Sequence, residues 1–454
     1  MSSIPLSEVR IPNSSDRRAF LRAGAASIGF SLSGWLGNLA TAAAKDPARK
    51  KSCILLWMNG GPSTIDLWDL KVGHDNGGPF KEIATNAPGL AIGEHLPGLA
   101  KWGDRLAVVR SMTTKEGDHG RATYLMRTGQ LPMGAINYPS VGAILSKELG
   151  DPTAELPNFV SVAPQRFFNA DAYGSGFLGP QYAPLVVADA GFGNTPTDNV
   201  DQLLKVKNLD RPESVSKEQS LARLEMLRQS HEDFAAGRPG AVAASHASAY
   251  DRASRLMQST SIKAFELGEE KAELRDKYGR NLFGQGCLLA RRLVERGVPF
   301  VEVSLGNWDT HQNNFDAVKT LCGTLDKAWA TLMGDLKDRG LLDSTMIVWM
   351  GEFGRTPRIN GQKGRDHFPA AWSAVLAGGG IKGGQAIGKT SKDGTTVAER
   401  PVTTVDLLAT VCKGLGVDPD KQNMSNVGRP IRLVDRSAKP IAEALACTPA
   451  SRSR

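Results

Sequence analysis

Short apolar runs alternate with longer amphipathic stretches along most of the chain. Apolar runs that stop at glycine or polar residues are typical of strands buried on both faces of a sheet. We predict five such strands, and in a mostly parallel sheet their carboxyl ends would share one edge. The predicted strands are 53–58, 105–109, 298–305, 345–350 and 371–377.

Amphipathic segments closed by glycine separate these runs and predict helices. Strands that alternate with helices favour a mostly parallel sheet covered by helices on both faces. The expected fold class is therefore α/β, with three layers. The clearest predicted helices are 120–128, 315–339 and 405–415.

Two segments depart from this alternation. Residues 130–200 are rich in Pro, Gly and Asn and predict long surface loops. Residues 214–296 have Leu, Ala, Met and charged residues at helical spacing, which predicts a helical insertion with a break at 237–240. We expect one main domain over 45–435 and a tail over 436–454.

The N-terminus predicts export. Arg17-Arg18 precede Phe20-Leu21 and an uncharged stretch over 23–44, and small-residue cleavage candidates lie at 40–44. This pattern is typical of a twin-arginine signal peptide over 1–44, which would deliver the protein to the periplasm or the outside of the cell. An amphipathic helix or a membrane anchor are the alternatives. We expect no stable membrane span after cleavage.

Composition narrows the function classes. The chain has 454 residues, 41% hydrophobic and 22% charged, which excludes a disordered protein. The mean hydropathy of −0.25 excludes a polytopic membrane protein. Lys+Arg exceeds Asp+Glu by 55 − 47 = 8, spread along the chain without a basic stripe, so we expect no nucleic-acid partner. Five Cys without a CxxC pair predict no particular disulfide.

Imidazole and carboxylate groups follow or precede several of the predicted strands. This mixture suits a divalent metal of the zinc or manganese kind. Each residue alone has an ordinary alternative: a helix cap for Asp309 or His119, a surface turn for Asp366-His367, and an ion pair between Glu352 and Arg355. Their shared placement favours a site. The candidates are Asn59, Ser63, His119, Asp309, His311, Glu352, Arg355, Arg365, Asp366 and His367.

Several motifs together resemble a family of twin-arginine-exported bacterial proteins known as domain-of-unknown-function family fifteen-oh-one. The resemblance extends over nearly the whole chain after the signal segment. The activity of that family is not established. The motifs are Asn59-Gly-Gly-Pro-Ser63, Trp308-Asp-Thr-His311, Gly351-Glu-Phe-Gly-Arg-Thr-Pro357, Gly364-Arg-Asp-His-Phe-Pro369, 401–416 and Gly428-Arg-Pro430.

The order of elements is also similar to the alkaline phosphatase and sulfatase superfamily. The resemblance implies one or two divalent metals at the strand ends and cleavage of phosphate or sulfate esters. Superfamily members place a Ser, Thr or formylglycine nucleophile at the start of a helix that ends in Thr-Gly. Here that helix ends at Thr128-Gly129, and His119 occupies the nucleophile's place.

The resemblance also assigns metal positions and shows where this chain departs from them. Asp309, His311 and His367 match one metal position. The second is altered, because Asn59 replaces an Asp and Glu352-Phe353 replaces an Asp-His or Asp-Asn pair. Asp309 has its partner His311 two residues later, where phosphatases place it four later. We therefore expect Asp309, His311, Glu352 and His367 to bind zinc, calcium or manganese.

The remaining candidates would bind or act on the substrate. His119, Arg121 and Arg355 are the expected catalytic residues, and Asn59, Ser63, Arg365 and Asp366 would bind substrate. For His119 we rank metal ligand above general base and nucleophile, and expect a neutral ring because a helix N-terminus disfavours imidazolium. The predicted function is an exported metal-dependent hydrolase of sulfate or phosphate esters, acting on a small molecule or polysaccharide. The alternative is a non-catalytic binding protein, with an exported haem-domain protein as its partner.

Overall fold

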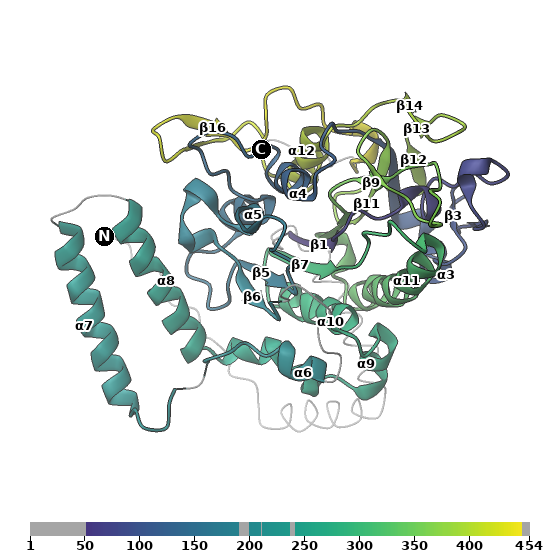
Figure 1. Ribbon diagram of the computed structural model, residues 1–454. Coiled ribbons are helices and arrows are strands. Elements are labelled where there is room, and N and C mark those ends of the chain that lie inside the picture. Colours follow the sequence, from purple (N-terminus) through teal and green to yellow (C-terminus); the bar gives the residue numbers. More distant parts are fainter. Residues whose placement is uncertain (1–50, 190–198, 210, 237–240, 447–454) are drawn as a thin grey trace, which may run out of the picture.

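The computed structural model describes residues 51–189, 199–209, 211–236 and 241–446. Its centre is an eight-stranded sheet in the order β12-β4-β11-β8-β1-β7-β5-β6 (Figure 1). The strands are β1 (Ser52–Met58), β4 (Leu106–Met112), β5 (Phe159–Val162), β6 (Leu185–Val187), β7 (Phe300–Leu305), β8 (Thr345–Met350), β11 (Trp372–Gly378) and β12 (Gln385–Ile387).

Both faces of the sheet are covered by helices, so the predicted three-layer α/β class is confirmed. Alternate residues of β1 point to opposite faces, with Ile54 and Leu56 in one apolar core and Leu55 and Trp57 in the other. The first core includes residues of α10 (Leu282–Glu295) and α11 (Asn314–Asp338). The second includes residues of α4 (His119–Thr128), α5 (Val141–Leu149) and α12 (Thr404–Gly414).

All five predicted strands exist, within a few residues of their expected bounds, and so do the three predicted helices. The prediction of surface loops over 130–200 is wrong in part, because this region contains α5 and two strands of the sheet, β5 and β6. Their apolar runs are only three or four residues long and stand among Pro and Gly, so no periodicity marks them.

The direction of β11 explains how its neighbouring loop reaches the functional edge. β11 is antiparallel to both β4 and β8, whereas β6, β5, β7, β1 and β8 are parallel to one another. The amino end of β11 therefore lies at the edge where the parallel strands have their carboxyl ends. Residues that precede β11, including His367, reach the same edge as residues that follow β1, β7 and β8.

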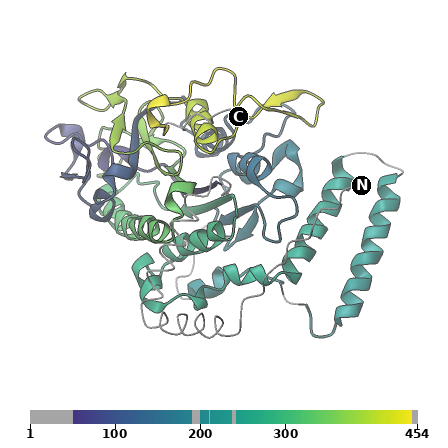
Figure 2. The same ribbon diagram turned by 180° about the vertical axis from the view of Figure 1, so that it is seen from behind.

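The helical insertion predicted over 214–296 is present and has two parts. α10 packs on β7 and belongs to the core of the sheet. α7 (Lys217–Ala236) and α8 (Ala241–Gln258) form a hairpin that stands to one side of the body in both views (Figures 1 and 2). Arg252 of α8 donates to the carbonyl oxygens of Gln181 and Ala183 at 3.0 Å and fixes the base of this hairpin to the body. The predicted break, 237–240, lies outside the described residues.

Short elements complete the described chain and do not enter the main sheet. They are β2 (Glu82–Ala84), β3 (Ala91–Gly93), α3 (Pro97–Ala100), α6 (Val200–Leu203), α9 (Ala272–Tyr278), β9 (Gly354–Arg355), β10 (His367–Phe368), β13 (Lys389–Thr390), β14 (Val397–Glu399), β15 (Gln422–Met424) and β16 (Pro430–Arg432).

Two predictions concern the chain ends. The signal peptide over 1–44 and the last residues of the tail lie outside the described residues. Within the described ranges, no helix is long and apolar enough to cross a membrane.

Four cysteines of the described ranges, Cys53, Cys287, Cys322 and Cys412, are buried and form no disulfide.

Candidate metal centre

Tight turns at the carboxyl edge of the sheet hold the candidate residues. β1 ends at Met58, and Gly60 in the following turn has a φ of +113°, a backbone conformation that residues other than glycine rarely adopt. A Cβ on Gly60 would lie 2.5 Å from the backbone nitrogen of Asp309, so glycine lets the turns after β1 and β7 approach each other. On the other side, Asp118 caps α4 by accepting from Arg121 N at 2.9 Å, which places His119 at the first position of the helix.

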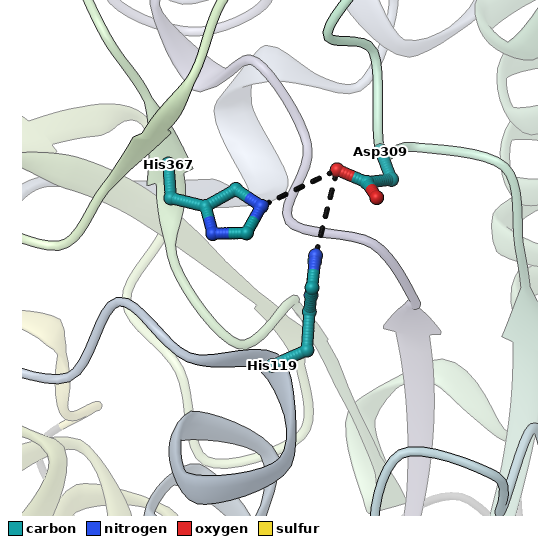
Figure 3. A group of neighbouring side chains, drawn as sticks. All are labelled: His119, Asp309 and His367. Atoms are coloured by element: carbon teal, nitrogen blue, oxygen red, sulfur yellow. Dashed lines mark ion pairs between the residues drawn. The ribbon is translucent and has the colours of Figure 1, made fainter.

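Asp309 lies at the centre of a group of imidazole rings. Its Oδ1 is 3.4 Å from Nε2 of His119 and 3.4 Å from Nε2 of His367 (Figure 3). The same oxygen is 3.1 Å from Nε2 of His311. Nε2 of His311 and Nε2 of His367 are 3.0 Å apart. Three ring nitrogens and one carboxylate oxygen therefore converge from three separate segments of the chain.

Each of the three rings is held through its other nitrogen. Nδ1 of His119 is 2.7 Å from Oε1 of Glu352, and Nδ1 of His311 is 2.8 Å from Oδ1 of Asp366. Nδ1 of His367 is 2.7 Å from the carbonyl oxygen of Gly117. When Nδ1–H donates to these acceptors, the lone pair of a neutral ring is left on Nε2, facing Asp309. Histidine ligands of metal ions are commonly oriented in this way.

The arrangement fits a divalent cation. His119, Asp309 and His367 can each offer one ligand atom, and these atoms all lie within 4.8 Å of one another. His119 Nε2 is buried and has no hydrogen-bond partner among the described residues, although it lies close to Asp309. A buried imidazole nitrogen without a hydrogen-bond partner is suited to bind a metal ion. His311 stands beside this group of three, with a side chain 42% exposed, at the solvent side.

The charges of the site change the predicted state of His119. Burial lowers the pKa of His119, but the carboxylates of Asp309 and Glu352 outweigh that effect and raise it to about 9. Without a bound cation the ring is therefore protonated at neutral pH, and the prediction of a neutral ring is wrong for that state. The helix N-terminus is a weaker influence than two carboxylates in contact. Burial also opposes ionisation of Asp309, but His119, His367 and Arg355 hold the pKa of that carboxyl well below its usual range.

Arg355 ties the turn after β1 to Asp309. Its guanidinium donates to Oδ1 of Asp309 and to the carbonyl oxygens of Gly60 and Gly61. Arg355 and His367 are direct partners in the two-stranded β9–β10 ladder, so the pairing of these strands also places His367 beside Asp309. Arg355 therefore holds Asp309 and the turn after β1 in position, and most of its N–H groups donate to acceptors within the protein.

Two expected substrate ligands are instead part of a buried support. Arg365 is fully buried and donates to both carboxylate oxygens of Asp66, at 2.9 and 2.7 Å, and to the carbonyl oxygens of Thr356, Pro357 and Asn76. Ser63 Oγ donates to Asp66 Oδ2 at 2.6 Å. No N–H of Arg365 is left for a substrate, so its predicted binding role is not supported.

Four other residues that we expected to bind the metal or the substrate, or to act in catalysis, contact different partners. Glu352 lies behind His119 and accepts from Gly60 N at 2.8 Å, so it orients a ligand where we predicted direct coordination. It does not pair with Arg355, so that alternative is wrong. Asp366 is exposed and holds His311.

The other two of these residues face neighbours outside the histidine group. Asn59 donates from Nδ2 to Gln165 Oε1 at 2.6 Å. Arg121 is exposed and pairs with Glu116 at 2.7 Å, and no ion pair or hydrogen bond within the described ranges joins it to Asp309 or the histidines.

The structure adds residues that sequence analysis missed. The ring of Phe168 stacks on His119 with a centroid separation of 4.3 Å and an interplanar angle of 7°. Phe353 lies against His119 at 4.9 Å and His367 at 4.7 Å. These apolar rings enclose the buried side of His119. Only Phe353 had a sequence signal, as the residue in place of a second metal ligand.

A comparison with protein families finds one match. The family model described as a protein of unknown function, DUF1501, matches residues 50–445. That range includes every candidate residue of the site. No curated protein sequence matches the chain.

Three of the solved structures with some likeness to the chain come from other bacteria. The lipoteichoic acid synthase LtaP of Listeria monocytogenes is 10% identical, with a TM-score of 0.42, and the match covers 89% of this chain and 77% of LtaP. A protein of the alkaline phosphatase superfamily from Vibrio parahaemolyticus is 15% identical, with a TM-score of 0.36, and the match covers 84% of this chain and 74% of that one. The PsFucS1 sulfatase of Pseudoalteromonas sp. is 15% identical, with a TM-score of 0.36, and the match covers 85% of this chain and 72% of the sulfatase. At these values the likeness says nothing about the substrate or mechanism of this chain.

Proposed function

The chain belongs to the DUF1501 family, and we propose that it is a metal-dependent hydrolase of anionic esters, of the sulfate or phosphate class. The observation that supports this most is the convergence of the Nε2 atoms of His119, His311 and His367 on Asp309 Oδ1. Every ring has an acceptor at Nδ1 that directs its Nε2 toward Asp309. A site held this firmly by its surroundings is suited to a cation and to chemistry that depends on one.

His119, Asp309 and His367 would hold the ion, which is zinc, manganese or calcium. The two imidazoles favour zinc or manganese over calcium, because calcium prefers oxygen ligands. A divalent ion supplies Lewis acidity toward an ester oxygen. Asp309 and His311 are each 42% exposed, so the site is open to an incoming ester on this side.

His311 is the residue that we assign to proton transfer. When Nδ1–H of His311 donates to Asp366, the lone pair of the neutral ring lies on Nε2, beside Asp309 and His367, where it would take a proton from an attacking water. The carboxylate would then stabilise the imidazolium that forms, as in other carboxylate–histidine pairs. Hydroxyl nucleophiles are poorly placed, because Ser63 donates to Asp66 and Thr310 donates to Asn314 at 2.7 Å. We therefore assign the attack to water.

Paired variants test these roles in the full chain. His119→Ala and Asp309→Ala should lose metal, measured by elemental analysis after dialysis, together with turnover of p-nitrophenyl sulfate and bis(p-nitrophenyl) phosphate. His311→Ala should keep the metal and lose turnover. His74 is exposed and lies outside the histidine group, so His74→Ala is the matched control and should change neither metal content nor turnover. Wild-type protein that binds no divalent ion would contradict the proposal, and so would a fully active His311→Ala protein.

Export by the twin-arginine route, with a periplasmic or extracellular location, is part of this proposal and rests on Arg17-Arg18 and the uncharged stretch after them. Replacing both arginines by lysine should leave the protein in the cytoplasm of its host. Fractionation of cells that express the two forms checks this.

A non-catalytic role is the second candidate, and the hairpin of α7 and α8 favours it. Leu221, Met226 and Met257 on these helices are large apolar side chains exposed to solvent. Such a surface fits a protein partner, which we propose to be an exported haem-domain protein. Coexpression should then yield a complex that Met226→Glu with Leu221→Glu weakens while metal content stays unchanged. Turnover lost in His311→Ala would favour the hydrolase instead.

A further inference from the structure

Two loops beside the histidine group carry exposed cationic side chains. Lys115 lies on the loop before α4, and the backbone of that loop contacts Nδ1 of His367. Arg358 and Lys363 lie on the turn that joins β9 to β10, directly before His367 in the chain. Within the described ranges, the side chains of these three cations form no ion pair and no hydrogen bond. Their charges therefore face solvent around the site.

The carboxylates of the same two loops are already engaged. Glu116 pairs with Arg121, and Asp118 caps α4 by accepting from the backbone N–H of Arg121. Asp366 pairs with His311. Neither loop has a carboxylate of its own left to cancel the three exposed cations. This side of the site, where His311 is exposed, therefore carries positive charge that attracts anions.

The backbone at Lys363 is unusual for a lysine. Its φ is +56°, in the left-handed region that glycine and asparagine adopt more easily. The turn is held firmly, because Asn360 Oδ1 accepts from Gly364 N at 2.9 Å and Asn360 Nδ2 donates to the carbonyl oxygen of His311 at 3.0 Å. Asp316, in the first turn of α11, forms no ion pair with Lys363 within the described ranges. Residues kept on a strained backbone are concentrated at functional sites.

We propose that Lys363, together with Arg358 and Lys115, binds a second anionic group of the substrate. The preferred ester would then carry an anionic group on its alcohol part as well as the group that is cleaved. This inference rests on the proposed function and narrows its substrate class. The reacting group would lie at the histidine group, and the second anion would lie toward the turn between β9 and β10. Each exposed ion pair contributes little on its own, so the preference depends on the cations acting together.

The test compares ligands that differ only in the second anion. Propane-1-sulfonate with propane-1,3-disulfonate, and hexane-1-sulfonate with hexane-1,6-disulfonate, are two such pairs that water does not cleave. Calorimetry measures their affinities for the protein with and without added metal. At least one disulfonate should bind roughly three- to tenfold more tightly than its monosulfonate, and this gain should shrink at high salt. A chain that ends in a carboxylate in place of the second sulfonate shows which anion is bound, and a gain with either supports the inference.

Matched variants assign the gain to the named cations. Lys363→Gly suits the left-handed backbone, and together with Arg358→Ala it should remove most of the gain while the monosulfonate affinity stays unchanged. Adding Lys115→Ala should remove what remains. Lys363→Arg should keep the gain. Lys382→Ala with Lys413→Ala removes two exposed cations at the opposite, amino edge of the sheet and should leave the gain as in wild type.

The outcomes separate this inference from the proposed function. Equal affinities for the monosulfonate and the disulfonate at both chain lengths would overturn the inference and leave the proposed hydrolase standing. A gain that survives in the Lys363→Gly, Arg358→Ala protein, or that the Lys382→Ala, Lys413→Ala control reduces equally, would overturn it as well. A protein that shows the gain but binds no divalent ion and cleaves no ester would instead remove the proposed function, while the anion site at Lys363 remained.

Discussion

Oε1 of Glu352 lies 2.7 Å from Nδ1 of His119, and the same oxygen accepts from Gly60 N at 2.8 Å. The carboxylate is fully buried, and its Oε2 has no hydrogen-bond partner among the described residues. One carboxylate oxygen therefore fixes both a histidine and the turn after β1. Without this acceptor, Nδ1 of His119 would lose the hydrogen bond that directs Nε2 toward Asp309.

Replacing Glu352 by Ala should weaken metal binding by about 10–100-fold, the usual effect of removing a partner behind a histidine ligand. Glu352→Gln keeps an acceptor oxygen for Nδ1–H and should recover part of the loss. Competition with a chromogenic chelator measures both affinities. An alanine variant with wild-type affinity would show that His119 needs no support from Glu352.

Metal uptake should release a proton from His119. The pKa of His119 is raised to about 9 in the metal-free protein, so at pH 7.5 the ring is protonated and a cation must displace that proton. Calorimetry in buffers of different ionisation enthalpy should give about one proton released per ion at pH 7.5 and little release above pH 10. Equal heats in all buffers at pH 7.5 would contradict a protonated ring.

The same shift predicts how metal-free stability changes with pH. Because the folded pKa of about 9 exceeds the ordinary value of 6.5, protonated His119 stabilises the fold. This contribution is complete below about pH 6.5 and is lost as the pH rises through 9. The free energy of unfolding should fall by at most about 1.4 kcal/mol per pH unit across that interval. Urea unfolding of metal-free wild type and His119→Gln checks this, since the variant should lack the slope.

Sequence patterns were sufficient for the five longer strands of the sheet, but not for its three short strands β5, β6 and β12 or for the detailed site. Buried strands such as 345–350 are visible as continuous apolar runs, and the edge position of Asp309 and His367 follows from where strands end. β5 and β6 were missed because three or four residues show no period. The position of Glu352 at a strand end was predicted, but its role behind a histidine was not. The ring of His119 lies between Glu352 and Asp309, and His119 belongs to α4, far away in the sequence.

Arginine roles were the least predictable feature. Arg355 and Arg365 lie beside the site in the sequence, and an arginine there can face a substrate or a carboxylate of its own chain. The partner of Arg365 is Asp66, 299 positions earlier, so no local pattern shows that its donors are used. Sequence spacing gives a position along the chain, whereas the direction of a long side chain depends on tertiary packing.

Arg365→Ala should destabilise the fold by about 3–5 kcal/mol, because it leaves the buried Asp66 carboxylate without its charged partner. The exposed pair of Arg432 and Asp420 provides the control, and Arg432→Ala should cost about 1 kcal/mol or less. Denaturant unfolding of both variants measures the difference. Similar small losses in both would mean that the buried Arg365–Asp66 pair contributes no more to stability than a surface pair.

Gly60→Ala separates backbone strain from the close approach of two turns. The added Cβ would meet Asp309 N at 2.5 Å and would stand on a backbone with φ +113°. Gly73 also has a positive φ, +80°, but a Cβ there has nothing within 4 Å, so Gly73→Ala adds strain alone. We expect Gly73→Ala to cost about 1–2 kcal/mol and to leave metal affinity intact. Gly60→Ala should cost more and should also weaken metal binding, because Asp309, Glu352 and Arg355 all depend on the Gly60 turn. Unfolding curves and chelator competition on the two variants provide the comparison, and equal metal affinities would show that the turn after β1 does not position Asp309.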